Sequence, residues 1–158
     1  MTTEDKVLRD QLLALLRGGN AHLTFDDAVA DFPMAYINVK PPQVSYTPWH
    51  LLEHLRLAQW DILEFIRNPN HESPPWPEGY WPSPDEQTDE AGWQNTLNQF
   101  RTDLKAVEVL VTNPNTNFFT PIPHAPDYTI FREILLVADH NAYHIGEFAI
   151  LRQVMGTW

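Results

Sequence analysis

Apolar residues recur at spacings of three and four along four long stretches of this chain, and no stretch alternates with the period of two that a half-buried strand shows. The clearest stretch begins at Thr47-Pro48, a capping residue followed by a proline that suits the first helical position. Long helices are predicted at residues 4–17, 49–67, 89–111 and 128–154, and a short one at residues 25–32. The pattern therefore predicts an all-α fold, a four-helix bundle with a short extra helix.

Proline-rich connections separate these stretches, at residues 35–45, 70–84 and 113–126. Proline removes a backbone donor, so none of the three can be regular helix. The middle connection also carries Trp76, Tyr80 and Trp81. Such aromatics indicate a segment packed on the body, which lines a pocket or forms a dimer surface. A length of 158 residues suits a single domain over residues 1–158.

The net charge and the absence of cysteine exclude several kinds of binding partner and of metal site. The formal net charge is -11, so binding to a nucleic acid backbone or to an anionic membrane is not expected. The chain has no cysteine, which excludes disulfides and thiolate metal ligands within it. Residues 1–10 are polar, unlike a signal peptide, and no apolar run approaches the ~20 residues that span a bilayer. We expect a soluble cytoplasmic protein.

Three histidines interrupt apolar helix faces. His140 and His144 are four residues apart, which puts them one turn apart on a face that also carries Leu136, Val137 and Phe148. His54 lies in the same way among apolar residues of the second long helix. A buried imidazole needs a hydrogen-bond partner or a metal ion. The three together suggest a metal site, although a hydrogen-bonded structural role is the alternative for each of them.

The remaining histidines have simpler interpretations. His50 is one turn before His54 and is a candidate fourth ligand, but it falls three residues after the capping Thr47. That position favours a capping-box role. His22, His71 and His124 lie in predicted connections, and we expect ordinary surface residues there.

Two histidine-bearing segments resemble a known family. The first, Trp49-His50-Leu51-Leu52-Glu53-His54-Leu55, resembles the second helix of the DinB/YfiT-like superfamily. The other resembles that family's final-helix signature, H-x-x-Y-H-x-G-Q, and reads Asp139-His140-Asn141-Ala142-Tyr143-His144-Ile145-Gly146-Glu147. The chain departs from the signature at Glu147, where glutamine is common.

The resemblance implies an up-up-down-down bundle that is often a homodimer of bacterial origin. It also implies a site in which His54, His140 and His144 bind nickel, zinc, iron or manganese. Relatives include transferases and isomerases that use low-molecular-weight thiols. A metal-dependent enzyme acting on a small molecule is therefore expected, either a thiol-dependent S-transferase or a hydrolase. The alternative is a non-catalytic, stress-related bundle whose metal site is structural and closed by four protein ligands.

Two further residues are candidates for catalysis. Asp61 lies seven residues after His54 and returns to nearly the same helix face, where a carboxylate could act as an acid or base. Tyr143 could place its hydroxyl near the metal, although a packed aromatic is the alternative. Gly146 costs about 1 kcal/mol inside a helix relative to alanine, and close approach of a neighbouring helix would explain it.

Overall fold

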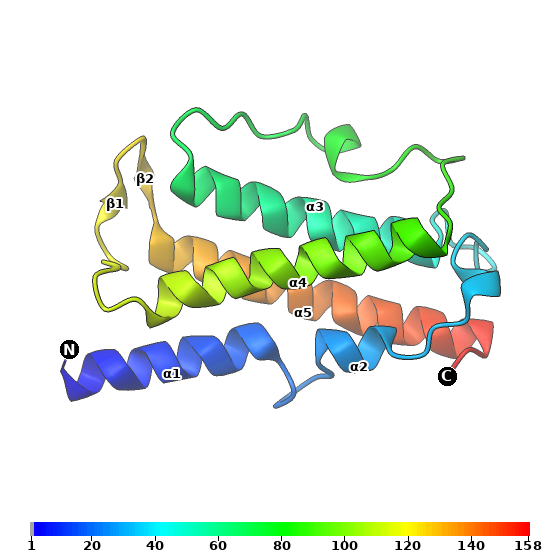
Figure 1. Ribbon diagram of the computed structural model, residues 1–158, viewed down its shortest axis with the longest axis horizontal. Helices are drawn as coiled ribbons and strands as arrows, with labels where there is room; N and C mark the ends of the chain where they lie inside the picture. Colours follow the sequence, from blue (N-terminus) through cyan, green and yellow to red (C-terminus); the bar gives the residue numbers. More distant parts are fainter. Residues whose placement is uncertain (1) are drawn as a thin grey trace.

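The computed structural model describes residues 2–158, and most of them are helical (Figure 1). The four long helices are α1 (Thr3–Arg17), α3 (Pro48–Arg67), α4 (Glu90–Thr112) and α5 (Ile130–Met155). A short helix, α2, spans Phe25–Val29, and two 3-10 turns are η1 (Met34–Tyr36) and η2 (Glu78–Tyr80). The expected all-α bundle with a short extra helix is confirmed.

The four long helices form a bundle in which each packs against two of the others. Helix α3 packs against α4 and α5, and α1 packs against the same two helices from the other side. Along the chain the helices run up, down, down and up (Figure 1), which differs from the expected order of up, up, down, down. Two connections account for the difference: residues 18–47 continue onward in the direction of α1, so that α3 returns antiparallel to it, and α4 begins only after a return along the whole of α3 by the connection at residues 68–89. We call this connection the strap (residues 68–89).

Side-chain caps explain where the helices start. An oxygen of Thr2, Thr47, Asp89 or Thr129 accepts a hydrogen bond from a backbone N–H in the first turn of α1, α3, α4 and α5, respectively. Such caps satisfy donors that the helix itself leaves free. The long helices accordingly begin and end within two residues of the predicted positions: 3–17, 48–67, 90–112 and 130–155, against 4–17, 49–67, 89–111 and 128–154.

A small hairpin was not expected from the sequence. Strands β1 (Pro121–Ile122) and β2 (Ala125–Thr129) pair antiparallel directly before α5. The hairpin takes Tyr128 and Thr129 out of the predicted last helix, so α5 starts two residues later. Strand β1 has only two residues, and the five residues of β2 do not alternate between buried and exposed, so the sequence showed no period-two pattern here.

The core forms two clusters along the bundle, and α3 and α5 contribute to both. Helix α3 is buried along most of its length and also carries polar residues, His50, His54 and Asp61, which are buried as well. These three lie on one face of α3, and the strap covers that face. No helix among residues 2–158 is long and apolar enough to cross a membrane.

Candidate metal centre

Three imidazole nitrogens converge between α3 and α5. Nε2 of His54 lies 3.2 Å from Nε2 of His144 and 3.2 Å from Nε2 of His140. His54 and His144 are buried and His140 is partly buried. Among the described residues these three form the one cluster of side chains placed to hold a metal ion, with ligand atoms all within 4.8 Å of one another. The sequence predicted this set, and the fold brings its members together.

Hydrogen bonds on the far side of two rings fix which nitrogen points inward. Nδ1 of His54 donates to the carbonyl oxygen of Tyr80 at 2.8 Å, and Nδ1 of His144 donates to Oε2 of Glu147 at 2.6 Å. A carbonyl or carboxylate oxygen can only accept, so each Nδ1 bears a hydrogen, and in the neutral form of each ring Nε2 keeps its lone pair. Two lone pairs thus face each other at 3.2 Å, an arrangement that a cation between them stabilises.

A proton is not well suited to be that cation. Burial lowers the pKa of His54, and the nearby His144 lowers it further, although the hydrogen bond to Tyr80 acts against both. Burial, together with the other two imidazoles, lowers the pKa of His140 to about 3. Near neutral pH these two rings are therefore neutral, the form in which imidazole binds a metal.

The observed spacing fits a transition metal. Two ligands at about 2.0–2.1 Å from a tetrahedral zinc ion lie about 3.3 Å apart, close to the 3.2 Å between the Nε2 atoms of His54 and His144. Nδ1 of His140 is buried and has no hydrogen-bond partner within residues 2–158, so this ring is held less firmly than the other two. The donor set and its geometry fit a divalent metal ion.

Glu147 lies directly behind His144. Its Oε2 accepts from His144 and its Oε1 accepts from the hydroxyl of Tyr46. Burial raises the pKa of this carboxyl, but the two hydrogen bonds and the nearby imidazoles outweigh burial and keep its pKa below the ordinary value. The chain's departure from the family signature is therefore an ionised carboxylate that orients a metal-ligand candidate. Tyr46 was missed in the sequence, because it lies in a non-periodic connection with no spacing signal.

The strap supplies the other side of the centre. Trp81 stacks on the ring of His54 with the centroids 3.9 Å apart and the planes 5° from parallel. Tyr46 packs against Trp81 in turn. Of the aromatics that the sequence singled out in this segment, Tyr80 and Trp81 reach the site, whereas Trp76 is 74% exposed.

His50 is engaged elsewhere. Its backbone N–H is capped by Thr47, as expected, but its ring does not complete a capping box. Nε2 of His50 instead lies 2.8 Å from the carbonyl oxygen of Glu86 in the strap. His50 therefore binds the strap and is not in the group of converging nitrogens.

Asp61 and His71 pair with each other. Oδ1 of Asp61 accepts from Nε2 of His71 and Oδ2 accepts from the hydroxyl of Tyr80, both at 2.7 Å. The side chain of His71 is only 7% exposed, so the expectation of an ordinary surface residue was wrong for it. Histidine in a loop gave no sign of burial, because its partner Asp61 lies on a different element.

Tyr143 and Gly146 face outward on α5. The ring of Tyr143 packs edge-on against His144, with centroids 4.8 Å apart, and the residue is 70% exposed. A Cβ placed on Gly146 would meet nothing within 4 Å among the described residues. The expected close approach of a neighbouring helix is therefore wrong within this chain.

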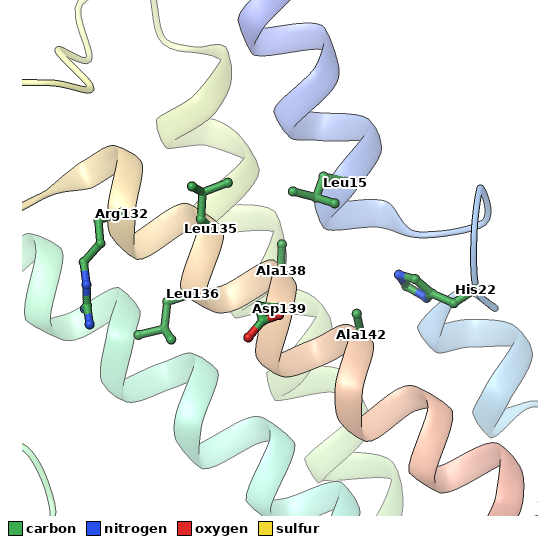
Figure 2. A pocket seen from close by; sticks show the side chains of 8 residues that line it. All are labelled: Leu15, His22, Arg132, Leu135, Leu136, Ala138, Asp139 and Ala142. Atoms are coloured by element: carbon green, nitrogen blue, oxygen red, sulfur yellow. The ribbon is translucent and has the colours of Figure 1, made fainter.

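A surface pocket of about 530 Å³ is lined by residues of α1, of the loop after α1 and of α5 (Figure 2). Leu15 of α1 and His22 of the following loop line one side of it, and Leu135, Ala138 and Ala142 of α5 line the other. None of the three converging histidines contributes to its lining. Helix α5 therefore presents the imidazoles on one face and this pocket on another.

Fold and site together define an all-α bundle with three histidines positioned to bind a divalent metal ion. In a comparison with known families, the model of the DinB superfamily matches residues 20–148, a range that includes all three histidines. The chain belongs to the DinB superfamily. Searches of curated proteins and of solved structures gave no match.

Proposed function

We propose that this chain is a metal-dependent enzyme that acts on a small molecule. One observation carries the proposal: three imidazole nitrogen donors converge, and no fourth histidine, cysteine or carboxylate within residues 2–158 joins them. Catalytic sites commonly use three protein ligands and keep a position for substrate, whereas structural sites are closed by four.

The residues nearest to the trio support an open position. His50 is held by Glu86, and both oxygens of Glu147 are occupied by His144 and Tyr46, so neither residue is free to act as a fourth ligand. His140 is partly exposed and Tyr143 is largely exposed, which makes the Tyr143 side the route for substrate. A divalent metal ion bound there would polarise a coordinated substrate atom as a Lewis acid.

The substrate that we favour is a low-molecular-weight thiol, used by the enzyme in an S-transferase reaction. The resemblance to thiol-dependent relatives supports this choice, and the chain has no cysteine of its own to supply the sulfur. In this proposal Tyr143, with its exposed ring beside His144, is the catalytic residue that contacts the substrate. Its hydroxyl would donate to or accept from the bound molecule.

The experiment measures conjugation of an electrophile with several bacterial thiols, before and after loading the untagged protein with zinc, nickel, iron or manganese. We expect a rate that requires both metal and thiol and that disappears in the His140→Ala/His144→Ala variant. Metal-dependent ester or amide hydrolysis without thiol would replace the transferase by the hydrolase. Equal, negligible metal contents in the wild type and the double variant would refute the metal centre itself.

A further inference from the structure

The strap (residues 68–89) runs alongside α3 (Figure 1), and three polar residues of one α3 face make hydrogen bonds to it. Nε2 of His50 lies 2.8 Å from the carbonyl oxygen of Glu86, and Nδ1 of His54 donates to the carbonyl oxygen of Tyr80. Asp61 adds the third point, two turns beyond His54. One face of α3 therefore holds both a metal-ligand candidate and the segment that orients it.

Asp61 is fully occupied by strap residues. Each carboxylate oxygen accepts one hydrogen bond, from His71 and from the hydroxyl of Tyr80. The side chains of Asp61 and His71 are 11% and 7% exposed. Burial and the hydrogen bond to Asp61 raise the pKa of Tyr80 to about 12, so its hydroxyl remains a donor at neutral pH. With both oxygens used, Asp61 is placed to anchor the strap and not to exchange protons with a substrate.

Tyr80 is held at both ends. Its hydroxyl is fixed by Asp61, and its backbone carbonyl receives the proton-bearing Nδ1 of His54. The next residue, Trp81, lies flat on the same imidazole. A shift of Tyr80 would therefore move both the acceptor that sets the tautomer of His54 and the ring that sets its plane.

We propose that Asp61 is a positioning residue for His54, acting through Tyr80. Asp61 holds the phenol of Tyr80, the fixed backbone of Tyr80 holds Nδ1 of His54, and Nε2 is thereby aimed at His140 and His144. The inference rests on the proposed function at one point, namely that Nε2 of His54 binds a metal ion. The orientation of His54 can be measured without any metal.

The test compares Asp61→Asn, Tyr80→Phe and the double variant. Tyr80→Phe is the mildest change, since it removes only a hydroxyl that does not touch His54. The control is Glu108→Gln, which removes a buried carboxylate on the α1–α4 side, where it pairs with Arg17 and Lys105. Thermal unfolding of each variant checks that it is folded.

The first readout is zinc affinity, from competition with a chromophoric chelator. Loss of an outer partner of a metal ligand typically weakens binding 10–100-fold. We expect about tenfold weaker zinc binding in Asp61→Asn and in Tyr80→Phe, no further loss in the double variant, and wild-type affinity in Glu108→Gln. Wild-type affinity in both single variants would overturn the proposal and leave the metal centre intact.

The second readout is the ¹⁵N spectrum of the histidine rings in the metal-free protein. We expect His54 to be protonated at Nδ1 in the wild type and to populate both tautomers in Tyr80→Phe. If the wild type binds neither zinc nor nickel, iron or manganese, the proposed function fails, and this spectrum alone decides on Asp61. An unchanged Nδ1-protonated His54 in both variants would then overturn its positioning role.

Discussion

The molecule contains the same group of side chains twice. In the metal centre, Glu147 accepts hydrogen bonds from His144 and Tyr46; under the strap, Asp61 accepts hydrogen bonds from His71 and Tyr80. Each group is a carboxylate, buried in Asp61 and partly buried in Glu147, that is bonded to one histidine and one tyrosine. The two groups differ in what the second nitrogen of the histidine meets.

That difference distinguishes the metal centre from the contact that only holds the strap on α3. Nε2 of His144 faces another imidazole nitrogen at 3.2 Å, whereas His71 lies outside the cluster of possible ligands. The carboxylate and tyrosine therefore do not make a metal site by themselves. They fix a histidine in place, and the position of its free nitrogen decides whether that fixed ring can bind an ion.

The largest expected effect comes from removing the histidine of one group, His144, and comparing it with removal of the histidine of the other group, His71. His144→Ala should weaken zinc binding by more than about 100-fold, the upper limit for loss of an outer partner, because a ligand itself is lost. His71→Ala should retain wild-type affinity within a few-fold. Zinc titration of both purified variants checks this, and equal losses in the two would break the comparison.

The next effect concerns the carboxylate behind the ligand. Glu147→Ala removes both the acceptor and the charge, and should weaken zinc binding about 100-fold; Glu147→Gln keeps an acceptor and should weaken it about tenfold. Asp139→Asn is the matched control, since Asp139 is exposed and lies next to His140 in the chain. If the control lost as much affinity as Glu147→Gln, net charge and not orientation would be the cause.

Lowering the pH tests His140, the converging histidine whose Nδ1 has no hydrogen-bond partner within the described residues. Burial lowers its pKa to about 3 in the folded chain, against about 6.5 in an unfolded one. Between these values the unfolded state binds the extra proton, so stability of the metal-free protein should fall as pH falls from 6.5 towards 3.

At pH 5 this linkage amounts to a loss of about 2 kcal/mol relative to pH 7. The variant His140→Gln, whose side chain does not titrate, should lose correspondingly less over the same range. Urea unfolding of both metal-free proteins at pH 7, 6 and 5 measures the difference. Parallel pH profiles would show that His140 is not held neutral by burial.

Much of the fold follows from local signals in the sequence. Apolar spacing and the cap at Thr47 determined the long helices to within two residues, because both signals act within a few positions of the chain. The same periodicity put His54, His140 and His144 on core-facing sides. Their meeting was then predicted from the resemblance and from the cost of burying an unpaired imidazole.

Only the tertiary structure decided what surrounds those three histidines. The path of the strap along α3, the pairing of Asp61 with His71 and the contact of Tyr46 with Glu147 join residues from proline-rich segments, which have no periodicity, to residues on helices. Such contacts depend on how the chain crosses the bundle, and many routes are compatible with the same local pattern. The sequence by itself therefore determined the helices and the three inward-facing imidazoles. The folded chain decided which oxygen atom holds each ring, because that choice is made by segments far apart in the sequence.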